Sequence, residues 1–93
     1  MNRKNLTFTL TTTFLLFLGS PSIAVIDDYQ DAVDAYNRED YKTSYQLMLP
    51  LAEKGVAQAQ YNLGVMYEKG KGVKQNHRKA KKWFSLAAEQ ELA

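Results

Sequence analysis

The chain has 93 residues, a formal net charge of +2, one histidine and no cysteine. Without cysteine, no disulfide can stabilise the fold, so its stability has to come from packing. A single histidine also excludes a metal site with two imidazole ligands, and we expect neither a metal nor a cofactor.

The first 24 residues show the order of regions typical of a secretory signal peptide. A basic opening at residues 2–5 precedes an apolar run from Leu6 to Leu18, and Ser22 and Ala24 are small residues suited to a cleavage site. The run is too short for a membrane-spanning helix, which needs about 20 mainly apolar residues. We therefore predict a signal peptide over 1–24, cleavage after Ala24, a secreted or periplasmic location and no stable membrane insertion after cleavage.

Removal of this leader leaves residues 25–93 with ten basic and ten acidic side chains, and so with no formal net charge. Such a balance argues against nucleic acid, which we do not expect among the partners. The charges are separated along the chain, because residues 25–55 sum to −4 and residues 56–93 sum to +4. This separation could bring two copies together head to tail or orient the chain on a partner. Alternatively, it is ordinary variation in surface charge, whose electrostatic effect salt screens over about 8–10 Å.

Residues 25–55 are predicted to form a first helix pair. The first helix should begin near Asp27. Its buried face is indicated by apolar and aromatic residues at i, i+3, i+4 and i+7, namely Tyr29, Ala32, Val33 and Tyr36. A second helix follows Asp40, which is suited to an N-cap, and Gly55 ends it. Pro50 falls inside this helix, where its missing amide should kink the helix or weaken the last turn.

Residues 56–93 are predicted to form a second pair, with a helix from Ala57 to about Lys69 and a last helix capped by Asn76. We expect Gly64 to let a neighbouring helix approach closely, and the loop glycines to adopt positive φ. The inward positions of the two helices are expected to be Ala59, Leu63, Met66, Tyr67, Gly70, Ala80, Trp83, Phe84, Ala87 and Ala88.

Self-comparison supports two units, since Ala52/Ala88, Glu53/Glu89 and Ala57/Ala93 match at an offset of 36 residues, the length of a two-helix repeat. The second unit, with its longer glycine loop, closely resembles the Sel-1-like repeat family, which is related to tetratricopeptide repeats. The first unit, over residues 25–55, has a shorter loop and is closer to the tetratricopeptide form. The positions that carry this resemblance are mainly buried side chains and loop residues, namely Ala59, Leu63, Gly64, Tyr67, Gly70, Gly72, Val73, Ala80, Trp83, Ala87 and Ala88.

The resemblance implies an all-α fold, a right-handed α-α superhelix of antiparallel helix pairs with about two units. It also implies a binding function without catalysis, as a scaffold or regulator in the bacterial envelope or outside the cell, with an unidentified protein or peptide as partner. Because solenoids need about three units to bury their apolar faces, we expect either self-association through the uncapped C-terminal end or truncation of a longer array.

Two groups of residues are candidates for partner binding. The outward positions of the helix over 57–69 should line a concave surface, although Tyr61 packing on a neighbouring pair is an equal alternative; they are Gln58, Tyr61, Asn62, Val65 and Lys69. An acidic strip on the first helix either attracts a basic partner or, as we favour, is a solvated face that stabilises the helix N-terminus; it comprises Asp27, Asp31 and Asp34.

The alternative function is an envelope hydrolase of the same repeat family, acting on cell-wall or β-lactam substrates. It would depend on His77 as a base, with Ser44 or Ser85 as nucleophile, and neither serine has a recognisable motif. We therefore predict no catalytic residue and no enzymatic activity, with His77 as a structural residue in the first turn of the last helix.

Overall fold

A computed structural model describes residues 22–92 of the chain, and this part is helical without strands. Four helices follow one another in these residues: α2 (Ser22–Asn37), α3 (Tyr41–Glu53), α4 (Ala57–Lys69) and α5 (His77–Leu92). The predicted all-α class is thereby confirmed. The predicted signal peptide lies largely outside the described residues. None of the described helices is both long and apolar enough to span a bilayer.

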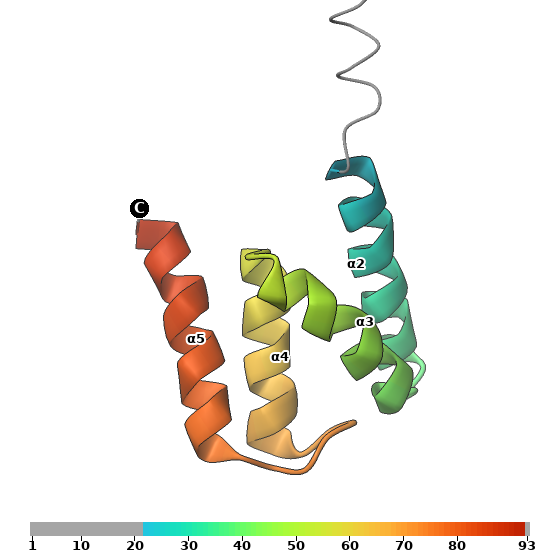
Figure 1. The fold of residues 1–93 in the computed structure, drawn as a ribbon. Helices are drawn as coiled ribbons and strands as arrows, with labels where there is room; N and C mark the ends of the chain where they lie inside the picture. Colours follow the sequence, from blue (N-terminus) through green and yellow to red (C-terminus); the bar gives the residue numbers. More distant parts are fainter. Residues whose placement is uncertain (1–21, 93) are drawn as a thin grey trace, which may run out of the picture.

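The helices form two antiparallel pairs that stack side by side (Figure 1). The chain runs along α2, returns along α3, and repeats this course in α4 and α5, so that α2 and α4 point the same way. α3 packs against both α2 and α4, and α4 also packs against α5. This arrangement leaves α2 and α4, the first helices of the two pairs, on either side of α3.

The helix boundaries follow the capping residues. Asp40 accepts a hydrogen bond from the Thr43 amide at 3.3 Å, and Asn76 accepts one from the Lys79 amide at 3.0 Å, so both predicted N-caps are confirmed. Gly70 ends α4 in the left-handed conformation with φ +69°. α2 begins at Ser22, five residues before the predicted start, because no glycine or proline separates Ser22 from Asp27.

The core consists of small and medium apolar side chains from all four helices. Its buried members are Ala32, Met48, Leu51, Ala52, Ala59, Leu63, Met66, Tyr67 and Ala80, with Val73, Trp83 and Phe84 half-buried against them. Two inward predictions are wrong. Gly70 is exposed because it lies beyond the end of α4, and Ala88 is exposed because no helix among residues 22–92 covers that side of α5.

Two glycines allow backbone and rings to approach closely. A Cβ at Gly64 would lie 2.7 Å from two ring atoms of Phe84, which confirms the expected close approach between α4 and α5. Gly72 has φ +75°, and a Cβ there would collide with the carbonyl of Tyr41 at the start of α3. The loop between α4 and α5 is therefore held against the first helix pair.

Candidate interaction groove

A groove of ≈ 370 Å³ lies between α2 and α4, with Met48 of α3 among its lining residues. Its walls come from the first helix of each pair, and they carry phenol, amide and aliphatic groups without a formal charge. We call this surface the groove and define it by Tyr29, Val33, Tyr36, Asn37, Met48, Tyr61, Asn62 and Val65. Three of the five concave positions predicted on the helix over 57–69 belong to it.

The two walls are joined by a hydrogen bond. Asn62 donates from Nδ2 to the hydroxyl of Tyr29 at 2.9 Å, so an α4 side chain fixes an α2 ring in place. The oxygen of Asn62 and the amide of Asn37 stand beside apolar surface from Val33 and Val65. Amides flanking an apolar floor suit a ligand that presents peptide groups and an apolar side chain.

Tyr61 connects the groove to two further hollows. It is 56% exposed, and its ring lies 5.4 Å from that of Phe84 in a tilted arrangement. A hollow of ≈ 390 Å³ beside α5 is lined by Tyr61, Phe84, Ala87, Ala88 and Glu91. A smaller hollow of ≈ 250 Å³ is lined by Tyr29, Ala57, Gln58, Tyr61, Asn62 and Glu91. Tyr61 thus packs on α5 of its own pair and remains more than half exposed.

The remaining predicted binding residues lie outside the groove. Lys69 is exposed at the end of α4, and Gln58 is exposed in the smaller hollow. Asp27, Asp31 and Asp34 are exposed on α2, where Asp34 accepts a hydrogen bond from Gln30 at 3.0 Å. The acidic strip and the groove are therefore separate surfaces.

Lys71 supports one wall of the groove, a role that the sequence did not suggest. Its Nζ donates to the hydroxyl of Tyr41 at 3.2 Å and lies 4.7 Å from the centre of that ring. The same Nζ lies 5.6 Å from the centre of the Tyr36 ring, and the two rings meet edge to face at 4.9 Å. The hydrogen bond to Tyr41, with the nearby Tyr36, raises the pKa of Lys71. In the sequence, only the position of Lys71 between Gly70 and Gly72 hints at this contact.

Buried and partly buried polar contacts also join the helices to one another. The hydroxyls of Tyr45 and Tyr67 lie 2.8 Å apart and join α3 to α4. Burial, together with this hydrogen bond, raises the pKa of Tyr67 to about 12. Gln60 donates to the Ala52 carbonyl at 3.1 Å and accepts from Gln90 at 2.8 Å, which links α3, α4 and α5.

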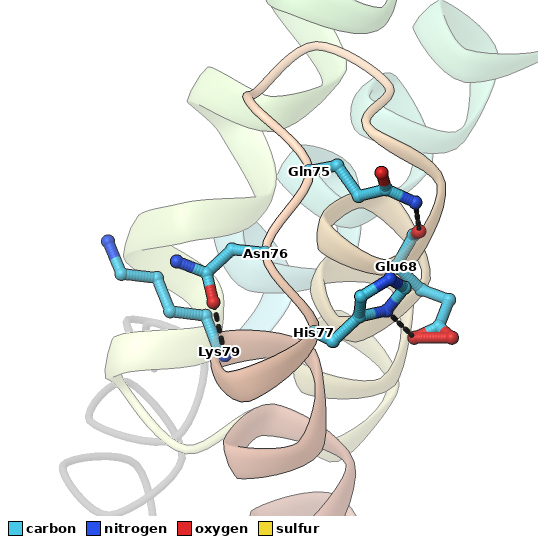
Figure 2. Close-up of polar contacts among 5 residues, drawn as sticks. All are labelled: Glu68, Gln75, Asn76, His77 and Lys79. Atoms are coloured by element: carbon cyan, nitrogen blue, oxygen red, sulfur yellow. Dashed lines mark hydrogen bonds and ion pairs between the residues drawn. The ribbon is translucent and has the colours of Figure 1, made fainter.

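His77 belongs to a polar cluster at the loop before α5 (Figure 2). Its Nδ1 lies 3.1 Å from a carboxylate oxygen of Glu68, and both side chains are exposed. Gln75 also donates to the Glu68 carbonyl at 2.8 Å, so the cluster attaches the loop to the end of α4. Ser44, the buried candidate nucleophile, instead donates to the Ala32 carbonyl at 2.8 Å. Within residues 22–92, no group of three acidic, histidine or cysteine residues could hold a metal ion.

Stacked antiparallel helix pairs with a groove between their first helices define a helical-repeat protein of the tetratricopeptide-like class. Residues 57–92, which span α4 and α5, match the family described as the Sel1 repeat. The second helix pair is therefore a Sel1 repeat, which confirms the predicted resemblance. Repeats of this family are generally non-catalytic modules for protein–protein interaction. No solved structure matches the chain.

Proposed function

We propose that the chain is an exported repeat module that binds a segment of another protein in the groove between α2 and α4. The observation that supports this most directly is the groove itself, which is open, concave and lined by uncharged aromatic, amide and aliphatic side chains. Aromatic and amide side chains are the types that supply contact area and hydrogen bonds at recognition surfaces. The module would act as a scaffold or regulator.

Recognition would depend on shape and neutral polar contacts. An apolar side chain of the ligand would lie on Val33 and Val65, above the buried Met48, and its peptide groups would bond to Asn37 and Asn62. Because Asn62 is already oriented by its bond to Tyr29, the free chain holds this donor and acceptor in position before binding. Such preorganisation reduces the entropy lost on association.

Export is the second part of the proposal, and it is supported by the basic, apolar and small-residue regions of the first 24 residues. We expect the native protein to be secreted or periplasmic and to begin at Val25. Expression with a C-terminal tag, fractionation of the cells and N-terminal sequencing test this. An uncleaved chain that stays in the cytoplasm would contradict export without affecting the binding proposal.

Peptide selection tests the groove. Twelve-residue peptides selected from a random library on the purified chain should bind the wild type and Gln46→Lys equally, since Gln46 is exposed on α3 and does not line the groove. Val65→Lys adds a charge to an apolar wall and should weaken binding at least tenfold, about 1.4 kcal/mol. Equal affinities for all three proteins, each checked for helix content by circular dichroism, would refute the proposed site.

A further inference from the structure

The two helix pairs are equivalent position by position, although the offset differs between their helices. α3 aligns with α5 at 36 residues, and α2 aligns with α4 at 32 residues. The difference of four arises because residues 38–40 link the first pair whereas residues 70–76 link the second. Several matched positions are chemically similar, namely Tyr29/Tyr61, Val33/Val65, Ala32/Gly64, Met48/Phe84 and Ala52/Ala88.

In the first pair, one face of α3 is covered by α4. Tyr45 meets Tyr67 edge to face with ring centres 5.9 Å apart, and the Ala52 carbonyl accepts from Gln60. Met48 lies between Tyr45 and Ala52 on this face, and both Met48 and Ala52 are only 1% exposed. α4 contributes three fully buried residues to the core, namely Ala59, Leu63 and Met66.

The same face recurs on α5 without a covering helix among the described residues. The positions equivalent to Tyr45, Met48 and Ala52 are Lys81, Phe84 and Ala88. Lys81 and Ala88 are exposed and Phe84 is half-buried. Phe84 and Ala88 line the hollow of ≈ 390 Å³, which also includes Tyr61 and Glu91. α5 therefore offers an apolar hollow where α3 holds α4.

We propose that this face of α5 binds an amphipathic helix of a partner protein, in the position that α4 takes on α3. The partner helix would carry apolar residues at the places of Ala59, Leu63 and Met66. It would carry a carboxylate at the place of Tyr67, because Lys81 replaces the Tyr45 that Tyr67 contacts in the first pair. An acidic residue at this place would form an ion pair with the ammonium group of Lys81, which a tyrosine could not do.

A second copy of this chain, docked head to tail, fits the face poorly. At the offset of 32 residues, the α2 positions equivalent to Ala59, Leu63 and Met66 are Asp27, Asp31 and Asp34. Docking α2 on α5 would remove three carboxylates from water against Phe84 and Ala88, with Lys81 as the cation on that face. The acidic strip thus keeps this face of α2 in contact with water, and α2 of a second copy does not fit the apolar face of α5.

A helical peptide copied from α4 is a direct probe of this face. We would synthesise residues 57–69 with Gly64→Ala to raise helicity and a side-chain staple between positions 58 and 62, on the side away from the buried stripe. One version carries Tyr67→Glu and the other Tyr67→Lys. Fluorescence anisotropy should show that the Glu version binds the full chain about three- to tenfold more tightly than the Lys version. Lys81→Glu in the protein should reverse this order.

Two further variants separate this face from the groove. Ala88→Glu places a charge in the hollow at an exposed position and should abolish peptide binding, whereas Val65→Lys in the groove should leave it unchanged. The proposal is overturned if both peptides bind equally to wild type and Lys81→Glu, or if Ala88→Glu binds as wild type does. It is also overturned if sedimentation shows a dimer that Ala88→Glu dissociates, since a second copy would then occupy the face. None of these results bears on peptide selection by the groove.

Discussion

Gly64 tests whether close packing or helix propensity decides stability at the α4–α5 contact. Alanine in place of glycine inside a helix normally stabilises by about 1 kcal/mol. Here the added Cβ would lie 2.7 Å from two ring atoms of Phe84, about 1 Å closer than carbon atoms in favourable contact. Overpacking of this kind costs about 1–3 kcal/mol. We therefore expect Gly64→Ala to lower the free energy of unfolding by up to about 2 kcal/mol.

Thermal unfolding followed by circular dichroism measures this balance. In a domain of this size, 1 kcal/mol corresponds to about 4–8 °C in Tm, so Gly64→Ala should lower Tm by up to about 15 °C. In a Phe84→Ala background the clash is absent, and the same change should raise Tm by about 4–8 °C. A higher Tm for Gly64→Ala in the wild-type background would refute the reasoning, and so would an equal loss in both backgrounds.

Two other predictions concern the loop and the buried tyrosine. Gly72→Ala should lower Tm much more than Gly55→Ala does. Both glycines have positive φ, but only at Gly72 would the added Cβ collide with the Tyr41 carbonyl. Equal losses of Tm in the two variants would contradict this. The pKa of Tyr67 is raised to about 12 in the folded chain and is near 10 in the unfolded chain. Neutral Tyr67 therefore contributes at most about 3 kcal/mol to the free energy of unfolding, and this contribution is present below pH 10 and is lost as the pH rises towards 12. Tyr45→Phe removes the hydrogen bond and should reduce the fall in Tm between pH 9 and pH 11, and an unchanged fall would argue against this coupling.

The sequence predicted local features well because their causes are local. α4 was placed from Ala57 to about Lys69, as observed, since Gly70 is a strong stop signal. The N-caps at Asp40 and Asn76 depend on a side chain and an amide three residues away. The repeat itself was recognisable from glycines and small residues at fixed spacing.

Contacts between distant segments were not predictable in the same way. Helical periodicity identifies an apolar face but not the neighbour that covers it, which is why Ala88 was wrongly placed inside. The α2 wall of the groove depends on how two pairs stack, and the bond between Tyr29 and Asn62 spans 33 residues. Lys71 contacts its tyrosine rings only because the loop folds back onto the first pair.

The contact between the long loop and the first pair has a consequence for the proposed recognition of a ligand. Gly72 lies directly on the Tyr41 backbone and Lys71 holds Tyr36 and Tyr41, so a hinge motion between the pairs would break these bonds. The spacing of the two groove walls is thus set by the fold itself. Specificity can then diverge through exchange of individual wall residues, while the scaffold that carries them stays constant.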